Sequence, residues 1–62
     1  MPYVLVEMLE GRTVEQKREL VKRITEAVVD VVKVEPKEVE VRILNVKRED
    51  WAKGGQLFID RK

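Results

Sequence analysis

The sequence predicts an α/β fold, a small β-α-β subunit with a C-terminal β-hairpin. Residues 3–9 and 39–46 alternate between apolar and other side chains with the period of two that is typical of strands. Between them, residues 13 to about 32 carry apolar side chains at the spacing of one helix face. Near the end of the chain, Gly54-Gly55 is a turn signal that predicts the hairpin.

The first predicted strand ends where Glu10-Gly11-Arg12 interrupts the alternation. Thr13-Val14-Glu15-Gln16 follows and matches a capping box, in which the Thr13 hydroxyl and the Gln16 amide satisfy free backbone N–H groups. A helix should therefore begin at this point.

The predicted helix has one apolar stripe, which comprises Leu20, Val21, Ile24, Ala27, Val28 and Val31. Pro36 disfavours a helical conformation at Glu35, so we expect the helix to have ended by Val34. The second predicted strand then starts at Val39.

A strand, a long helix and a second strand predict a parallel pair with a right-handed crossover. The helix should cover one face of the pair, formed by Val4, Val6, Met8, Val39, Val41 and Ile43. The opposite face carries Tyr3, Leu5, Leu9, Leu44 and Val46, with only the short tail to cover it. Because parallel sheets are normally buried on both faces, we expect the chain to self-associate.

The C-terminal segment carries weaker signals. We expect a loop over residues 48–53, and a short strand over residues 56–59 that completes a hairpin or pairs with a neighbouring subunit. Residues 60–62 are expected to be frayed.

Size and composition limit the classes of protein to which this chain can belong. We expect one domain, residues 1–62, near the size at which a single core gives only a few kcal/mol of net stability. Cysteine and histidine are both absent, which excludes disulfides and the usual sulfur and imidazole metal ligands and leaves oligomerisation as support. The net charge of +1 offers no field for nucleic acid or an anionic membrane. Without a membrane span or secretory signal, a cytoplasmic location is expected.

The absence of Cys, His and Ser also excludes the familiar nucleophile–base pairs. Pro2 remains as an unusual candidate, because removal of Met1 would turn its nitrogen into a secondary amine. Ordinary α-amino groups titrate near about 7.7–8.0, and an apolar pocket with a nearby arginine should lower the pKa of this amine toward neutrality, where it could accept a proton. On spacing alone, the simpler interpretation is that Pro2 opens the first strand, where proline is well tolerated.

Four features stand in register along the whole chain: Pro2 before the first strand, Leu9-Glu10-Gly11-Arg12, Glu15-Gln16-Lys17, and Trp51 ahead of Gly54-Gly55. Together they resemble the 4-oxalocrotonate tautomerase family. The resemblance implies a βαβ subunit assembled as a homohexamer, a trimer of dimers. It also implies an isomerase that works without a cofactor on a small carboxylate such as 2-hydroxymuconate, by keto–enol tautomerisation of an unsaturated 2-hydroxy or 2-oxo acid.

The resemblance implies roles for three residues. Pro2 would move the proton, Arg12 would bind the distal carboxylate of the substrate and draw electron density toward it, and Trp51 would line the pocket and keep it apolar. Taken alone, Arg12 reads as a solvated arginine beside a helix N-terminus, although such ends mildly disfavour cations. Taken alone, Trp51 is expected to pack against a subunit interface. This position is compatible with lining the pocket.

One position departs from the family pattern. The prototype has a second substrate-binding arginine early in the second strand, where Glu40 aligns here. Arg42 lies two residues further along the same strand face, displaced by about 6–7 Å. Its guanidinium either reaches the pocket, or it pairs with Glu40 or another acid across a subunit interface. A carboxylate near the amine could also activate water, as in the related 3-chloroacrylic acid dehalogenases. A 3-haloacrylate dehalogenase or hydratase, and a non-catalytic oligomeric scaffold, are the two alternatives.

Overall fold

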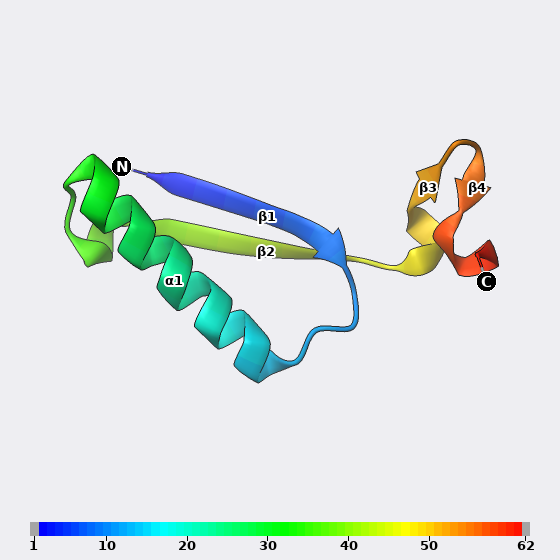
Figure 1. Ribbon diagram of the computed structural model, residues 1–62, viewed down its shortest axis with the longest axis horizontal. Coiled ribbons are helices and arrows are strands. Elements are labelled where there is room, and N and C mark those ends of the chain that lie inside the picture. Colours follow the sequence, from blue (N-terminus) through cyan, green and yellow to red (C-terminus); the bar gives the residue numbers. More distant parts are fainter. Residues whose placement is uncertain (1, 62) are drawn as a thin grey trace.

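The computed structural model describes residues 2–61 and confirms the predicted β-α-β unit with a C-terminal hairpin (Figure 1). Two strands, β1 (Tyr3–Leu9) and β2 (Glu40–Val46), form a parallel sheet. The helix α1 (Val14–Val32) connects them through a short 3₁₀ turn, η1 (Pro36–Glu38). The C-terminal part comprises η2 (Arg48–Asp50), the antiparallel hairpin of β3 (Ala52–Lys53) and β4 (Gln56–Leu57), and η3 (Phe58–Asp60).

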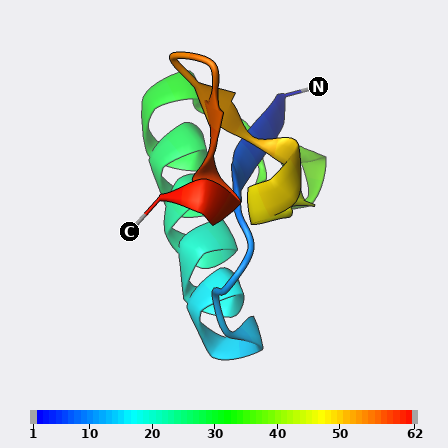
Figure 2. The ribbon, with the colours of Figure 1, turned by 90° about the vertical axis from the view of Figure 1, so that its right-hand side faces the viewer.

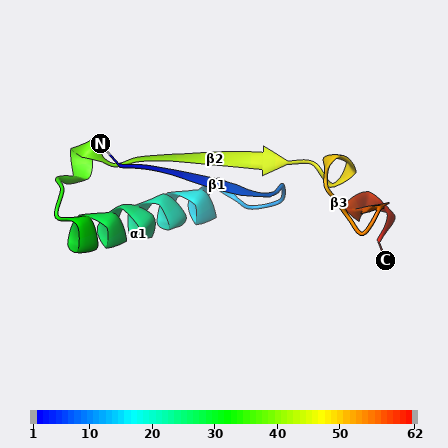
Figure 3. The same ribbon diagram turned by 90° about the horizontal axis from the view of Figure 1, so that it is seen from above.

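The strand pair is in register along its whole length, from Tyr3 opposite Glu40 to Leu9 opposite Val46. Helix α1 lies along one face of this pair, and Figure 3 shows the other face without a covering element. The strand residues predicted to face the helix are half-buried: Val4, Val6, Met8, Val41 and Ile43. On the opposite face, the exposed fractions of Tyr3, Leu5 and Leu44 are 53%, 49% and 39%.

The helix begins at the predicted capping box. The Thr13 hydroxyl accepts a hydrogen bond from the Gln16 N–H at 3.0 Å, and the Thr13 N–H donates to Gln16 Oε1 at 2.9 Å. At the other end Lys33 takes a left-handed conformation, with φ of 65°, and its N–H donates to the Val29 carbonyl at 3.0 Å. The helix therefore ends before Val34, as predicted.

The apolar stripe of α1 was predicted correctly only in part. Half-buried positions of the helix are Lys17, Leu20, Val21, Ile24, Thr25, Val28 and Val29. Ala27 and Val31 are exposed, Val31 by 76%, so the prediction that they belong to the covered stripe was wrong. Two strands about 4.8 Å apart make a platform narrower than the apolar side of the helix, and these two residues lie on the flank beyond it.

The exposed side of α1 is held by ion pairs along the helix. Glu15 pairs with Arg18, and the Arg23 Nε donates to Glu19 Oε2 at 2.6 Å. This hydrogen bond lowers the pKa of Glu19 and raises the pKa of Arg23. Both side chains are in solvent and contribute to the helix rather than to a site.

The C-terminal segment differs from its prediction in several places. Residues 48–53 are not a plain loop, because they form η2 and the first strand of the hairpin. The second hairpin strand covers only Gln56–Leu57, since Phe58 and Ile59 turn into η3 after the Phe58 N–H closes the hairpin on the Trp51 carbonyl at 2.8 Å.

The predictions for the end of the chain and for the start of the second strand also need correction. Asp60 and Arg61 are not frayed: the Arg61 N–H donates to the Phe58 carbonyl at 3.1 Å, and Lys62 lies outside the described residues. At the start of the second strand, Val39 caps η1 through a hydrogen bond to the Pro36 carbonyl, so β2 begins one residue later than predicted.

The chain is unusually open for its size. Its radius of gyration is 14.8 Å, whereas a compact domain of this length would have about 11 Å. Its accessible surface is 5090 Å², against about 4,200 Å² for a typical folded monomer of this mass. Figures 1 and 3 show the cause, because the hairpin stands apart from the β-α-β unit. Figure 2 views the molecule from the hairpin end, with the hairpin in front of the β-α-β unit. Within residues 2–61, none is fully buried, and no helix is long and apolar enough to cross a membrane.

Candidate active site

Pro2 lies at the N-terminal end of the sheet. It is half-buried, and its carbonyl accepts a hydrogen bond from the Glu40 N–H at 3.0 Å. Glu40 begins β2 and stands opposite Tyr3 in the strand register. The residue aligned with the second family arginine is therefore a direct backbone neighbour of Pro2.

Arg42 lies on the outer face of the sheet, opposite Leu5. Its side chain is exposed on the same side as Glu40. In the described part of the chain the ion pairs lie on α1, and none joins Arg42 to Glu40. The guanidinium is thus not held by Glu40 of its own chain.

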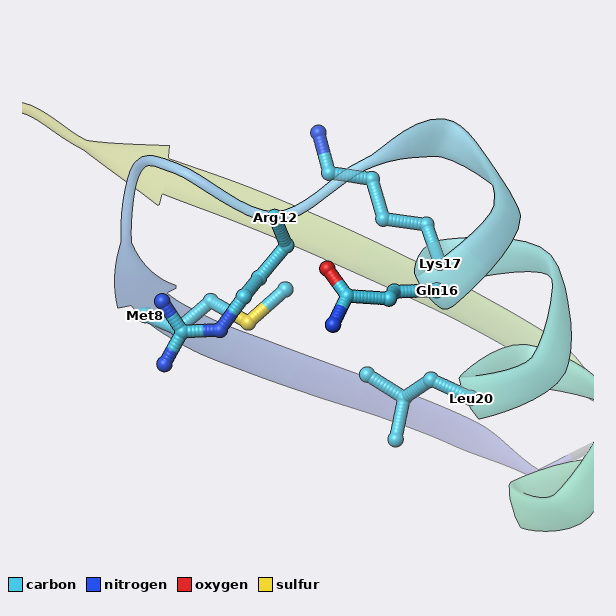
Figure 4. Close-up of a pocket in the computed structure, with 5 residues that line it drawn as sticks. All are labelled: Met8, Arg12, Gln16, Lys17 and Leu20. Carbon is cyan, nitrogen blue, oxygen red and sulfur yellow. The ribbon is translucent and has the colours of Figure 1, made fainter.

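Arg12 lies at the opposite end of β1, in the loop that leads into α1. Gly11, with φ of 121°, provides the backbone conformation that brings this loop back toward the sheet. Arg12 borders a hollow of about 200 Å³ that is lined by Met8, Arg12, Gln16, Lys17 and Leu20 (Figure 4). The hollow lies on the helix side of the sheet, between the end of β1 and the first turns of α1.

Trp51 lies beyond the C-terminal end of β2 and is half-buried. Its ring is 6.1 Å from that of Phe58, and it borders a second hollow of about 280 Å³. The other residues that line this hollow are Glu7, Val46, Asp50 and Ala52. Because Glu7 and Val46 point away from the helix, the Trp51 hollow lies on the outer side of the sheet.

A single subunit does not bring these residues together. The seven residues of β1 span about 23 Å, and this length separates Pro2 from Arg12. Trp51 is at the Arg12 end, but its hollow and the Arg12 hollow are on opposite faces of the sheet. The predicted site residues therefore form three separate groups in one chain.

Comparisons with known proteins agree with the family resemblance found in the sequence. The sequence model of the family described as "Tautomerase enzyme" matches residues 2–61. The chain belongs to the tautomerase family. It is accordingly an isomerase, and it resembles the 4-oxalocrotonate tautomerases within that family.

Two curated relatives of this tautomerase carry the name 2-hydroxymuconate tautomerase. The one from Bacillus subtilis (strain 168) is 43% identical over 60 residues, which cover 97% of each chain. The one from Comamonas testosteroni is 38% identical over 55 residues, 89% of this chain and 87% of the relative.

Solved structures show the same fold. A 4-oxalocrotonate tautomerase homologue is 44% identical with a TM-score of 0.95, and the match covers 100% of this chain and 98% of that chain. A heterohexamer 4-oxalocrotonate tautomerase from Chloroflexus aurantiacus J-10-fl is 32% identical with a TM-score of 0.92, and the match covers both chains completely.

Two residues beside Arg12 were not predicted as site residues of this tautomerase. Gln16 was assigned to the helix cap and, together with Lys17, to the family resemblance, yet both line the Arg12 hollow. Their positions in the first turn of the helix, together with Leu20 four residues after Gln16, are the sequence signal that could have identified them. Arginine, lysine and amide groups over Met8 and Leu20 make this end of the sheet suited to an anion with an apolar body.

Proposed function

We propose that this tautomerase interconverts the enol and keto forms of an unsaturated 2-hydroxy or 2-oxo carboxylate such as 2-hydroxymuconate. After Met1 is removed, the Pro2 amine is the proton-transfer base, and no cofactor takes part. The observation that carries the proposal is a half-buried Pro2 directly before β1, in a chain that is 43% identical to a 2-hydroxymuconate tautomerase.

The proposed reaction moves one proton. The uncharged Pro2 amine takes the proton from the enol hydroxyl and returns a proton to carbon as the carbonyl forms. The Arg12 guanidinium binds the distal carboxylate with its planar fork and stabilises the negative charge that spreads toward that end. An aromatic wall from Trp51 excludes water, which disfavours the protonated amine and keeps Pro2 able to accept a proton.

We propose that the working form is a homohexamer, a trimer of dimers, in which each chain is one domain. Pro2 of one subunit then meets Arg12 and Trp51 of other subunits, since one chain holds these residues apart. The exposed outer face of the sheet supports this assembly, with Tyr3, Leu5 and Leu44 open to solvent. The large surface of the isolated chain and the heterohexamer among its structural relatives support it as well.

Arg42 is proposed to contact the end of the substrate nearest to Pro2. Its exposed side chain is free of Glu40 within the described part of the chain, so it is available to a carboxylate bound between subunits. Arg42 lies about 6–7 Å further along the strand than the position of the second family arginine. A substrate held by Arg42 would therefore sit differently from one in the family prototype.

Glu40 supports a second candidate function, a dehalogenase or hydratase of 3-haloacrylates. Its N–H is hydrogen-bonded to the Pro2 carbonyl at 3.0 Å, so a carboxylate-bearing residue lies next to the proposed active amine. A carboxylate in this position can activate water, with the Pro2 ammonium as the acid. Halide release from 3-chloroacrylate or 3-bromoacrylate distinguishes this activity from tautomerisation.

Steady-state rates with two enols, 2-hydroxymuconate and phenylenolpyruvate, test the proposal. Retention of Met1, which makes the Pro2 nitrogen an amide, should lower kcat/KM by about 10²–10⁴-fold, because a positioned base contributes an effect of that size. Sedimentation of the Met1-retaining protein should show an unchanged oligomer, which separates loss of the base from loss of assembly. An equal rate in the Met1-retaining protein would overturn the proposal, and no Pro2-dependent rate with any enol or haloacrylate would favour the scaffold alternative.

A further inference from the structure

One flank of helix α1 carries an apolar seam that the sheet covers only in part. The α1 seam consists of Leu20, Ile24, Ala27 and Val31, at steps of four, three and four residues, which is the spacing along which two helices pack. Leu20 and Ile24 are half-buried, whereas Ala27 and Val31 are exposed. Because Ala27 is small, a second helix can come close to the middle of the seam.

Two residues of opposite charge lie along the solvent side of the seam. Arg23 and Asp30 are seven residues apart, so they project from the same side of the helix at a separation of about 10 Å along its axis. On the other side of the seam, the corresponding positions are the half-buried Val21 and Val28. The seam therefore has an apolar border toward the sheet and a charged border toward solvent.

Both charges can pair with groups outside the chain. Arg23 uses its Nε to donate to Glu19 Oε2 at 2.6 Å, which leaves the donors of its two terminal nitrogens available. The Arg23 side chain is 74% exposed. Asp30 is exposed as well, and the ion pairs in the described part of the chain do not include it. An open guanidinium and an open carboxylate thus stand two turns apart at one border of the seam.

An antiparallel second copy of the helix fits both the seam and its charged border. When Ile24 faces Ala27 of the other copy, the two ends of the seam face each other in the same way. In this register Arg23 lies within about 3 Å, measured along the axis, of Asp30 of the other copy, and two-fold symmetry repeats the pair. Helical side chains lean toward their own N-terminus, which moves these two groups toward each other in an antiparallel pair.

The same charges disfavour other ways of covering the seam. In a parallel pair, Arg23 would lie beside Arg23 and Asp30 beside Asp30, so that like charges would repel at both positions. A helix with an apolar border would leave both charges without a complement. The occupant that fits the seam is therefore a second copy of this chain, in the antiparallel direction.

We propose that Arg23 and Asp30 select a second copy of this chain as the partner of α1, through two reciprocal ion pairs that border an antiparallel contact between the α1 seams. The inference rests on the proposed assembly, and it adds the residues that decide which chains pair. It also accounts for the exposure of Ala27 and Val31 in the isolated chain, because the other copy covers them.

Charge reversal tests the selection with two variants that repel themselves. In Arg23→Glu both contacts set acid against acid, and in Asp30→Arg both set guanidinium against guanidinium, whereas a mixed pair of the two variants regains two ion pairs. Random assembly of equal amounts would give about a third of the hexamers three subunits of each kind. For the co-expressed variants we expect about two thirds or more in native mass spectrometry, since each exposed ion pair shifts an equilibrium by about two- to fivefold.

Matched variants separate the seam from general effects of charge. Lys22→Glu mixed with Glu26→Lys changes the same charges at exposed positions of the helix away from the seam, and this mixture should assemble at the random share. The double variant Arg23→Glu/Asp30→Arg lacks the contact with Glu19 but restores both reciprocal pairs, so it should form the native oligomer on its own. A random share for the two seam variants, or equal enrichment in the control mixture, would overturn the inference.

Sedimentation and turnover separate this inference from the proposals on which it rests. If the wild-type protein is a monomer at micromolar concentration, both the assembly and the inference fail. If it is an oligomer and the seam variants mix at random, the inference fails and the assembly stands. If the seam variants select each other but no enol is turned over, the inference stands and the proposed reaction fails.

Discussion

Pro2 and Arg12 lie at opposite ends of strand β1, so the residue proposed to move the proton and the residue proposed to bind the distal carboxylate are separated by the whole strand. The separation, about 23 Å for the seven residues of β1, is too long for one small substrate to bridge. A shared site between subunits removes the conflict. A shared site also predicts that two inactive variants can restore activity when their subunits are mixed.

Mixed oligomers should regain activity that neither parent has. If Pro2→Ala and Arg12→Ala subunits are co-assembled in equal amounts, about a quarter of the sites should combine a native Pro2 with a native Arg12. Activity at about that fraction of the wild-type value is the expected result, measured after co-expression with two different tags. A mixture of Pro2→Ala with the double variant is the control and should stay inactive. Activity in neither mixture would show that both residues act from one subunit.

The outer face of the sheet should control assembly. Leu5 is 49% exposed in the isolated chain and lies in the middle of that face. Because a charge buried at an apolar interface is costly, Leu5→Lys should shift the protein toward smaller species in sedimentation at micromolar concentration. Glu26→Lys on the exposed side of α1 is the control and should keep the native size. An unchanged oligomer in Leu5→Lys would place the interface elsewhere.

A clamp at the base of the hairpin should hold Trp51 in place. The Arg48 Nη2 donates to the Phe58 carbonyl at 3.0 Å, and the Arg61 guanidinium lies 4.5 Å from the centre of the Phe58 ring. Replacement Arg48→Met keeps the stem but removes the donor, and it should raise KM a few-fold while weakening the near-ultraviolet circular dichroism of the single tryptophan. Arg48→Lys should restore part of both signals. A tryptophan spectrum that is identical in Arg48→Met and wild type would contradict the clamp.

The end of helix α1 should be easy to stabilise. Lys33 has a φ of 65°, a left-handed conformation that costs a residue with a Cβ about 1–2 kcal/mol. Lys33→Gly should relieve most of this cost and raise the thermal midpoint, compared at one fixed protein concentration because the protein is expected to be oligomeric. Lys33→Ala keeps the Cβ and should give no such gain. Equal effects of glycine and alanine would show that the conformation is not strained.

Local signals in the sequence were sufficient for most of the fold. The two alternating segments and the Thr13–Gln16 capping box are properties of neighbouring residues, and the structure confirms β1, the start of α1 and the parallel pairing. Errors arose where tertiary geometry decides. Val31 fits the periodicity of the helix, but a two-stranded sheet is too narrow to cover it. Phe58 continues an apolar run, but it leaves the hairpin once its N–H has bonded to Trp51.

The candidate site was predicted as a list of residues but not as an arrangement. The family pattern identified Pro2, Arg12 and Trp51, yet periodicity says nothing about which end of a strand or which face of a sheet meets a neighbouring subunit. Gln16 was predicted to cap the helix and to belong to the family pattern, but not to line the site. Its place there depends on how the first turns of α1 lie against the end of β1, and only the three-dimensional structure determines that.

The pH dependence of kcat/KM for 2-hydroxymuconate, measured on protein shown by intact mass to lack Met1, tests the central claim most directly. A free Pro2 amine in an apolar site should give an ascending limb with an apparent pKa below the roughly 7.7–8.0 of an ordinary α-amino group, since the rate rises as the amine loses its proton. This limb should disappear when Met1 is retained and the nitrogen is an amide. A Met1-retaining protein with the full rate and the same pH profile would contradict the account.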